Sequence, residues 1–357
     1  MVNARCLGII MLDAGQGDAT LIVHPDNSLV LVDCGSKKNT NIVKTEIETA
    51  LDAYLQRTGN ALKALVLTHP DGDHYNLVDE LIVQKGVTIG TLYYGGAAKD
   101  YAGLTSWITN YKTQQPQRIG AVHAFGQSSC LPDPVPALSC ASVNGEPAVD
   151  VRVLAANAGS SLIKQEANPN SVVLLVTYMD INIFLMGDST VDTEGFILSW
   201  DKINQKLTTV LNGRHSVLKA GHHGSETSTG QAWLDKIQPK IVLISSDTKT
   251  FNGTSIPRKT VVDRVLAGPI YDFNGVHPNH YYVDYDSATQ RHEQVDTSKG
   301  VFTTLHLLEF AQNNLDFTAY GTSWYYTVTA VENNNTWSRG DIFVTPAVGW
   351  NLIKQPY

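Results

Sequence analysis

One short segment constrains this chain more than any other: an apolar run that ends in a turn dense with histidine and aspartate. Residues Leu62–Leu67 form a stretch that is apolar apart from Lys63, which is typical of a buried strand. The next seven residues read THPDGDH, so two imidazoles and two carboxylates fall between His69 and His74. Such groups repel or desolvate one another unless a cation lies among them. The segment therefore predicts a metal site at a strand end, and a solvated acidic turn is the alternative.

The residue types narrow the choice of metal. Histidine and aspartate together offer nitrogen and oxygen ligands, which suit Zn²⁺, Mn²⁺ or iron, whereas Ca²⁺ prefers oxygen alone. We expect divalent ions, with zinc as the first choice and manganese or iron as alternatives.

Two later segments place the same residue types after apolar strands. Asp188 follows the run Ile181–Met186 after a single glycine. His222 and His223 lie in the turn KAGHHGS, again at a strand end. A carboxylate at a buried strand end is well placed to bridge two cations, although alone it would indicate a cap or a turn. Adjacent histidines on a glycine-flanked turn point in different directions, so we expect one to bind metal and the other to contact substrate or donate a proton.

The apolar pattern along the chain predicts one α/β domain, residues 1–357. Residues 95–160 are poorly patterned and are interpreted as an insertion or a lid beside the site. Residues 266–357 are interpreted as a strand-rich C-terminal extension. The pattern predicts strands at 7–12, 19–24, 28–32, 62–67, 171–178, 181–186, 217–220 and 241–245, and helices at 42–57, 77–83 and 231–237.

Composition limits the partners. The hydrophobic content of 43% is enough for a packed core, and no apolar run approaches the roughly 18 residues of a membrane span. The net charge of −8 disfavours extended nucleic acid, because a phosphate backbone calls for a basic face. A local basic groove would escape this count, so extended nucleic acid stays open. We expect no membrane partner and leave the oligomeric state open.

The cysteines and the N-terminus bear on the compartment. Cys6, Cys34, Cys130 and Cys140 form no CxxC pair, which fits a reducing compartment. The first apolar run is too short for the core of a signal peptide, so a cytoplasmic location is the default. A secreted protein whose signal had been removed could instead join Cys130 to Cys140 across a proline-rich loop.

Taken in order, the motifs resemble those of the metallo-β-lactamase superfamily. Within it, the chain is most similar to the ComEC-type competence domains and to the branch of the pneumococcal phosphorylcholine esterase. The resemblance covers roughly Leu7 to Val265. It rests on DxGQGDA at 13–19, VDCG at 32–35, THxDxDH at 68–74, Asn168 to Ser171 before a strand, GD at 187–188 and GHHGS at 221–225.

The resemblance implies an αββα four-layer sandwich with insertions, and two metal ions at the open edge between the sheets. It places His69 and Asp71 on one ion. It places Asp73, His74 and one of the two adjacent histidines on the other ion, with Asp188 as the bridge. The implied metal ligands are His69, Asp71, Asp73, His74, Asp188 and His222.

Further roles are assigned around these ligands. We expect Asp73 and His223 to be catalytic, with His223 protonating the leaving group. Lys219 and Ser225 are expected to contact substrate. Carboxylates on neighbouring strand ends orient ligand histidines by accepting their second N–H, and this role is expected for Asp13, Asp18 and Asp33.

The chain departs from the superfamily pattern in three places. Asp71 stands where a second histidine is common, as in the ComEC-like branch. The mid-chain histidine ligand is missing, since Asn168 to Ser171 occupies that region. A later Gly-His-Pro is replaced by Ser255-Ile256-Pro257, for which His277 is a possible substitute although an exposed loop histidine is the simpler interpretation.

Two divalent metal ions at the implied site can hold a water between them and lower the pKa of that water towards neutrality. The resulting metal-bridging hydroxide then attacks phosphorus or a carbonyl carbon. A site rich in oxygen and poor in histidine favours phosphoesters. We therefore expect a metallo-hydrolase that cleaves a phosphodiester in a small-molecule or exposed substrate. Two alternatives stay open: hydrolysis of a lactone, thioester or β-lactam on the same fold, and a non-catalytic metal-binding module.

Overall fold

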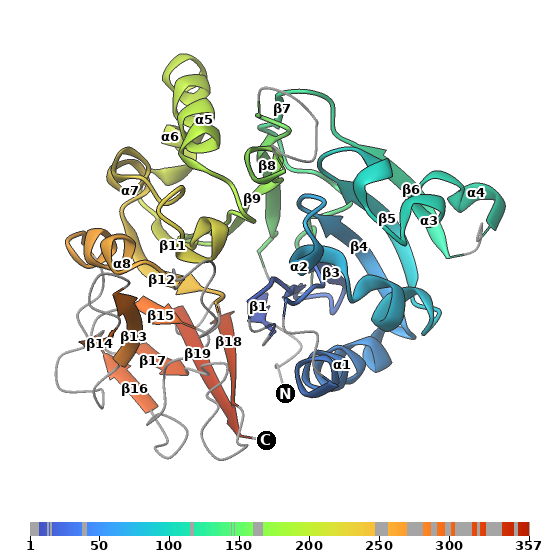
Figure 1. Cartoon of the computed structure of the whole chain (residues 1–357), viewed down its shortest axis with the longest axis horizontal. Coiled ribbons are helices and arrows are strands. Elements are labelled where there is room, and N and C mark those ends of the chain that lie inside the picture. Colours follow the sequence, from blue (N-terminus) through green and yellow to red (C-terminus); the bar gives the residue numbers. More distant parts are fainter. Residues whose placement is uncertain are drawn as a thin grey trace.

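The computed structural model describes residues 7–12, 14, 16–37, 41–114, 118–143, 145, 147–159, 167–246 and 256–269, together with the backbone of seven strands between 281 and 356. Within these residues the chain forms two large β-sheets, which lie against each other at the centre of the molecule (Figure 1).

The first sheet is mostly N-terminal but takes its edge from the end of the chain. Its strand order is β19-β18-β1-β2-β3-β4-β5-β6. The pairs β3–β4, β4–β5 and β5–β6 are parallel, and the others are antiparallel. The strands are β1 (Leu7–Met11), β2 (Thr20–Val23), β3 (Leu29–Val32), β4 (Ala61–Leu67), β5 (Thr88–Tyr94), β6 (Ile119–Ala124), β18 (Ser338–Thr345) and β19 (Gly349–Pro356).

The second sheet is built from the middle of the chain. Its order is β15-β12-β11-β10-β9-β8-β7, and the pairs β10–β11, β11–β12 and β12–β15 are parallel. Its strands are β7 (Ser129–Leu131), β8 (Asp150–Ala156), β9 (Val173–Tyr178), β10 (Ile181–Leu185), β11 (His215–Lys219), β12 (Pro239–Ile244) and β15 (Val301–Thr303). Two separate hairpins follow α8 in the chain: β13 (Tyr281–Asp286) with β14 (Arg291–Asp296), and β16 (Asp316–Ala319) with β17 (Thr322–Tyr325).

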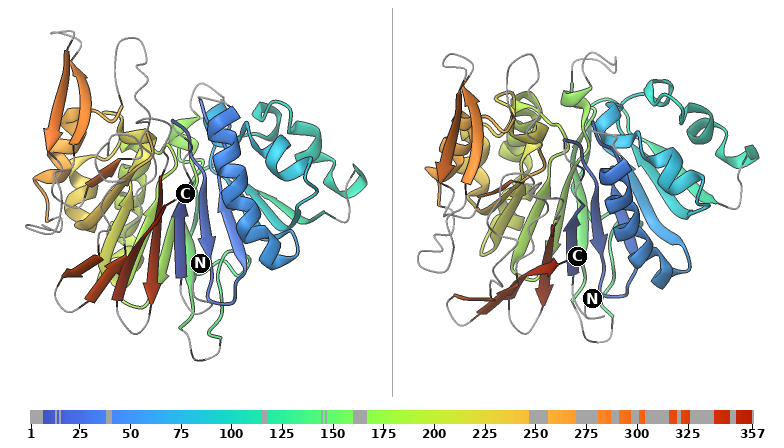
Figure 2. Two further views of the ribbon diagram at one scale, coloured as in Figure 1. Left: turned by 90° about the horizontal axis from the view of Figure 1, so that it is seen from below. Right: turned by 60° about the horizontal axis from the view of Figure 1, so that its bottom comes forward.

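Helices cover the outer face of each sheet, as Figure 2 shows for the blue helix α1 on one side and the yellow and orange helices on the other. On the side of the first sheet lie α1 (Asn41–Leu55), η1 (Gln56–Thr58), α2 (Gly72–Tyr75), η2 (Asp79–Val83), η3 (Ala98–Asp100), α3 (Thr105–Thr109) and α4 (Tyr111–Gln114). With the second sheet lie η5 (Asn168–Asn170), α5 (Val191–Asn204), α6 (Lys206–Leu211), η6 (Gly221–Gly224), α7 (Gln231–Ile237) and α8 (Lys259–Leu266).

Alternation along the strands produces these layers, because successive side chains of a strand point to opposite faces. In β1, Ile9 packs between the sheets, whereas Ile10 packs towards α1. In β10, Ile183 packs between the sheets, whereas Phe184 packs against Trp233 of α7. Three apolar cores result, one in each gap of a four-layer stack. The predicted αββα sandwich is confirmed.

Residues 95–160 differ from their predicted appearance as an insertion. They contain η3, α3, α4 and the strands β6, β7 and β8, which extend both sheets at one side. The edge strand β6 (IGAVHA) is mostly exposed, and its apolar residues are interrupted by Gly120 and His123 without a regular polar–apolar alternation, so its sequence shows no clear strand pattern. Helices α5, α6 and α8 were also not predicted. The division into one domain with an extension stays a prediction.

The described residues also bear on two expectations about location. Every helix in this part of the chain is too short or too polar to cross a lipid bilayer. Cys34, Cys130 and Cys140 are free thiols, so the optional Cys130–Cys140 bridge does not form in this structure.

Candidate metal centre

The candidate site lies where parallel strands of both sheets end. The strands β3 and β4 of the first sheet run parallel, as do β10, β11 and β12 of the second. Their carboxyl ends therefore meet at one edge of the sandwich. The loops that follow β3, β4, β10 and β11 carry the histidines and aspartates that the sequence predicts.

The loop after β4 turns directly into the short helix α2. Asp71 is the extended residue before this helix, and Asp73 and His74 lie in its single turn. The rings of His69 and His74 are 4.1 Å apart between centroids. His69, Asp73 and His74 are buried, whereas the Asp71 side chain is 36% exposed. The loop thus presents three buried groups and one group at the rim.

Asp33 fixes the orientation of this loop from the end of β3. Its carboxylate accepts hydrogen bonds from the Thr68 backbone N–H at 2.7 Å and from the Thr68 hydroxyl at 2.6 Å. It also lies 2.8 Å from Nδ1 of His74. A carboxylate that accepts the Nδ1–H leaves Nε2 of the ring available for a metal. The structure therefore places Asp33 where it orients a ligand histidine.

Asp188 lies between the groups of the two sheets. Its backbone N–H donates to the Ser171 hydroxyl at 3.1 Å, immediately after β10. One carboxylate oxygen is 3.1 Å from Nε2 of His74. The other is 3.9 Å from Nε2 of His69 and 3.5 Å from Nε2 of His223. This geometry suits a carboxylate shared between two cations.

The GHHG turn after β11 forces two consecutive histidines into the left-handed region, with φ of 44° at His222 and 52° at His223. Residues other than glycine rarely adopt this conformation, and it clusters at functional sites. The flanking glycines permit it: a Cβ at Gly221 would lie 2.6 Å from the Ser189 carbonyl oxygen, and one at Gly224 would lie 2.6 Å from Pro257. The two imidazoles consequently point in different directions.

His223 is the deeper of the two. It is fully buried, and its Nδ1 lies 2.8 Å from the Ser245 carbonyl oxygen, to which it donates. Its Nε2 then faces the centre, 3.3 Å from Oδ2 of Asp73. The tautomer that Ser245 selects is the one a metal ligand needs.

His222 lies at the open side, and its side chain is 23% exposed. Its Nδ1 is 2.7 Å from the Thr227 hydroxyl, and its Nε2 is 3.2 Å from the Asn168 amide and 3.9 Å from Asp188. The Ser225 hydroxyl lies 3.2 Å from the Thr227 hydroxyl. Ser225 therefore reaches His222 through Thr227, and any contact of Ser225 with substrate stays a prediction.

Lys219 is not where a substrate contact would be. It is 2% exposed, and its ammonium forms an ion pair with Asp18 and donates to the Gly187 carbonyl at 3.2 Å. Asp18 lies between β1 and β2, and its Oδ2 is 3.7 Å from Nδ1 of His74. The structure thus contradicts the predicted substrate contact of Lys219, because the side chain bridges the two sheets beneath the site instead of facing solvent.

The donor set fits metal ions. Within the described residues, Nε2 of His69, His74 and His223 is buried and has no hydrogen-bond partner, which is costly in a protein interior. Among the described residues, four groups have ligand atoms within 4.8 Å of one another, and two of them leave out Asp18: His69 with His74 and Asp188, and Asp73 with His74 and His223. Converging imidazole nitrogens and carboxylate oxygens suit divalent metal ions.

Electrostatics point the same way. Burial opposes the charged form of His74, yet the carboxylates of Asp188 and Asp33 outweigh it and raise the pKa of His74 well above its usual value. Burial is likewise outweighed at His223, whose pKa is raised by Asp188 and Asp73. Burial raises the pKa of Asp188, but the charges of His223 and His74 hold it well below its usual range. Carboxylates this deeply buried require positive charge, which a metal ion would supply in place of the histidine protons.

Further residues at the site were not predicted, among them Lys37, Asn168 and Ser245. The Lys37 ammonium lies 2.9 Å from Oδ2 of Asp73, Asn168 contacts His222, and Ser245 orients His223. Lys37 follows the VDCG motif by two positions, which is the signal that could have indicated it. Asp13, Ser255 and His277 lie outside the described residues.

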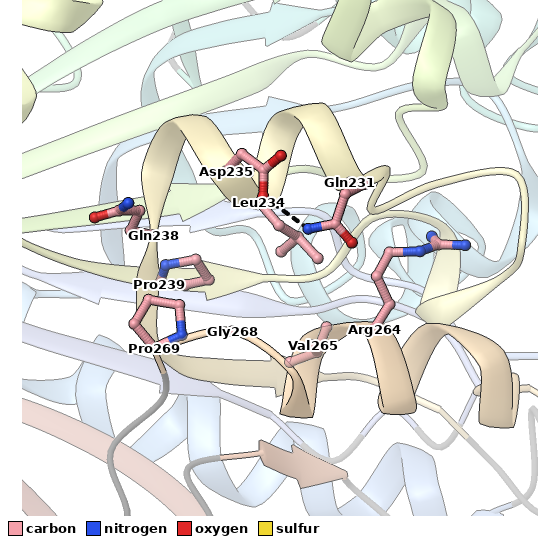
Figure 3. A pocket seen from close by; sticks show the side chains of 9 residues that line it. All are labelled: Gln231, Leu234, Asp235, Gln238, Pro239, Arg264, Val265, Gly268 and Pro269. Carbon is pink, nitrogen blue, oxygen red and sulfur yellow. Dashed lines mark hydrogen bonds between the residues drawn. The ribbon is translucent and has the colours of Figure 1, made fainter.

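A small cleft between α7 and α8 lies apart from this centre (Figure 3). The Gln231 amide donates to Asp235 across its rim at 2.7 Å, and the Arg264 guanidinium donates to the Thr229 carbonyl at 2.8 Å. Gln231, Asp235 and Arg264, three of its polar side chains, are thus paired with each other or with backbone, which is typical of a surface hollow.

In a comparison with known protein families, the model of the metallo-beta-lactamase superfamily matches residues 12–246 of this chain. The match covers more than half of the chain, so the protein belongs to this superfamily. It contains candidate metal-binding residues at the strand ends described above.

Relatives and solved structures are similar to parts of the chain. Recombination protein 2 of Haemophilus influenzae is 26% identical over 256 residues, which cover 71% of this chain and 26% of that protein. ComE operon protein 3 of Bacillus subtilis is 25% identical over 262 residues, covering 66% and 28% respectively. The chain therefore spans about a quarter of the length of these curated relatives. The short form of human tRNase Z superposes with a TM-score of 0.37 at 12% identity, covering 68% of this chain and 93% of that one.

Proposed function

We propose that this protein is a metal-dependent phosphodiesterase with a two-metal site. The observation that carries the proposal is the pair of overlapping His/Asp groups, both of which include His74 and are joined through Asp188. Two-metal sites of this kind recur in phosphatases and nucleases, where paired cations clamp the attacking and leaving oxygens of a phosphoester.

The ligands divide into two sets. His69, Asp71 and one oxygen of Asp188 would hold one ion. Asp73, His74, His223 and Asp188 would hold the other. When bound, the ions would activate a water as nucleophile near neutral pH and stabilise charge on the phosphoryl oxygens. Zinc is our first choice, with manganese or iron as alternatives.

The roles of the two adjacent histidines are exchanged relative to the sequence-based expectation. His223 is buried, and its Nε2 faces the Asp73 and Asp188 carboxylates inside the centre, where a metal ion and not a leaving group would lie. His222 is partly exposed at the open side, and Thr227 and Asn168 hold its ring. We therefore assign metal binding to His223 and protonation of the leaving oxygen to His222.

The substrate class follows from charge and access. Asp71 replaces a histidine on one ion, which makes that set rich in oxygen and favours phosphoesters over lactams. The net charge of −8 favours a small diester or an exposed phosphodiester end over a long duplex. The name Recombination protein 2, borne by a relative, makes a single-stranded oligonucleotide a natural second substrate to test.

The test combines metal content with turnover of bis-p-nitrophenyl phosphate and of a single-stranded oligonucleotide. We expect about two metal ions per chain, and hydrolysis that stops on chelation and returns with added metal. Asp73→Ala should lose metal and activity, whereas Asp235→Ala, an exposed carboxylate on α7, should change neither.

Two results would contradict the proposal. Bound metal without hydrolysis of either diester would move the assignment to lactones, thioesters or β-lactams, or to a binding module. A protein that takes up no metal under any reconstitution would refute the site itself.

A further inference from the structure

Lys37 lies at the mouth of the metal centre on a rigid loop. The loop follows β3, and the Cys34 N–H donates to the His74 carbonyl at 2.8 Å, while the Lys37 N–H donates to the Gln16 carbonyl at 2.6 Å. These bonds fix the backbone against α2 and the β1–β2 loop. The side chain is 38% exposed, and its ammonium reaches Oδ2 of Asp73 at 2.9 Å.

Among the described residues, two lysines contact carboxylates of this centre, and they differ in burial. Lys219 is buried and its charge is used by Asp18 beneath the site. Lys37 enters from the solvent side. Lys37 is therefore the lysine that a ligand entering the site from solvent would contact.

The balance of charges indicates whether this ligand is an anion. Asp18 is neutralised by Lys219. Two divalent ions would balance the remaining carboxylates of the centre, which are Asp33, Asp71, Asp73 and Asp188. The hydroxide that the two ions would activate adds one negative charge, and the Lys37 ammonium offsets it at the mouth. A phosphodiester, which carries a single negative charge, would therefore meet a loaded site that is not net negative, whereas a neutral ester would gain nothing from the ammonium.

A bound metal ion also changes what Lys37 contacts. With a cation on Asp73, the ammonium no longer serves to neutralise that carboxylate and is repelled by the ion. A lysine side chain is long and flexible and carries three donors, so it can turn towards a phosphoryl oxygen held at the metals. The exposure of Lys37 leaves it room for this movement.

We propose that Lys37 is a substrate-binding residue of this site, which contacts a non-bridging oxygen of the phosphodiester and makes the enzyme selective for anionic substrates. The inference rests on the proposed phosphodiesterase function and adds a specificity-determining contact to it.

The test compares Lys37→Met, Lys37→Arg and the wild type, each loaded with metal. Lys37→Met should raise KM for bis-p-nitrophenyl phosphate and the dissociation constant of inorganic phosphate by about tenfold, the worth of one charge-assisted hydrogen bond. Metal content should stay unchanged. Lys37→Arg should restore phosphate binding to within about threefold of the wild type, because the charge is kept.

Lys44→Met is the matched control, since it removes a lysine of α1 that pairs with Glu80 on the same side of the molecule, away from the metals. It should leave both quantities unchanged. Phosphate binding that is equal in Lys37→Met and the wild type overturns the inference, even if turnover is normal. Loss of metal without a change in phosphate binding also overturns it, because Lys37 would then serve only Asp73.

The two proposals fail separately. A wild type that binds phosphate through Lys37 but hydrolyses no diester refutes the phosphodiesterase assignment and leaves the anion contact intact. A wild type that hydrolyses diesters but binds phosphate independently of Lys37 refutes the Lys37 contact and leaves the phosphodiesterase assignment intact. Wild-type protein that binds no phosphate at all refutes the contact.

Discussion

The two sheets contribute to the metal centre in different ways. The first sheet supplies its ligands from one continuous turn, residues 69–74, in which β4 runs straight into α2. The second sheet supplies Asp188 after β10 and the two histidines after β11, from loops more than 30 residues apart. The first half is thus a local motif, and the second half is assembled by tertiary structure.

This difference shows in what holds each half. The first half is held mainly by Asp33, which accepts hydrogen bonds from Thr68 and His74. The second half depends on separate anchors: the Ser171 hydroxyl for Asp188 and the Ser245 carbonyl for His223. Changes in the second half should therefore remove ligands individually and reveal which ion each one serves.

Asp188→Asn should have the largest effect, because this carboxylate reaches His69, His74 and His223 at once. We expect it to lower the content from about two ions to less than one and to reduce turnover to the level of the chelated protein. Metal analysis and bis-p-nitrophenyl phosphate hydrolysis measure both.

Asp71→Asn is the matched comparison from the first half. Asp71 is a rim carboxylate that lies 3.8 Å from Nε2 of His69, so this variant should lose at most one ion and keep residual activity. Equal losses in the two variants would show that Asp188 is not the shared ligand.

His223→Ala should come next. It removes a buried ligand, so we expect loss of one ion and a large fall in kcat.

His222→Ala should instead keep its metal and lose about a hundredfold in kcat, as is usual for a general acid. The loss should be greater for a diester with an alkyl leaving group than for p-nitrophenol, which departs without a proton. Metal lost from His222→Ala but not from His223→Ala would reverse our assignment.

The same comparison explains how far the sequence predicted the site. The candidate ligands of the turn at residues 69–74 lie together as the sequence predicts, because they are adjacent and follow a buried strand, and metal binding by them stays a prediction. The sequence did not predict which of His222 and His223 faces the interior. This depends on the left-handed turn and on the Ser245 carbonyl, which lies 22 positions from His223.

Lys219 and Lys37 show the limit of sequence reasoning most directly. Lys219 stands beside the GHHG motif and was expected to contact substrate, but its position in β11 directs it to Asp18. Lys37 has no motif of its own and is brought to Asp73 by the loop after β3. The layers of the fold were predicted because strand alternation is local, whereas the edge strand β6 lacks that pattern and was missed.

Lys219→Met should have the smallest effect on the chemistry and the clearest effect on the junction between the sheets. It leaves the buried Asp18 without its ammonium partner, and breaking a buried ion pair on one side costs about 3–5 kcal/mol. The free energy of unfolding in denaturant, measured with metal chelated, should fall by that amount.

The double variant Lys219→Met with Asp18→Asn decides the interpretation. It removes both charges together, so it should regain most of the lost free energy, because an isosteric uncharged pair costs little compared with one unpaired buried charge. Phosphate binding should be unchanged in the double variant, in contrast to Lys37→Met. If the double variant is as unstable as Lys219→Met alone, the ion pair does not join the two sheets, and Lys219 stabilises the site through the Gly187 carbonyl instead.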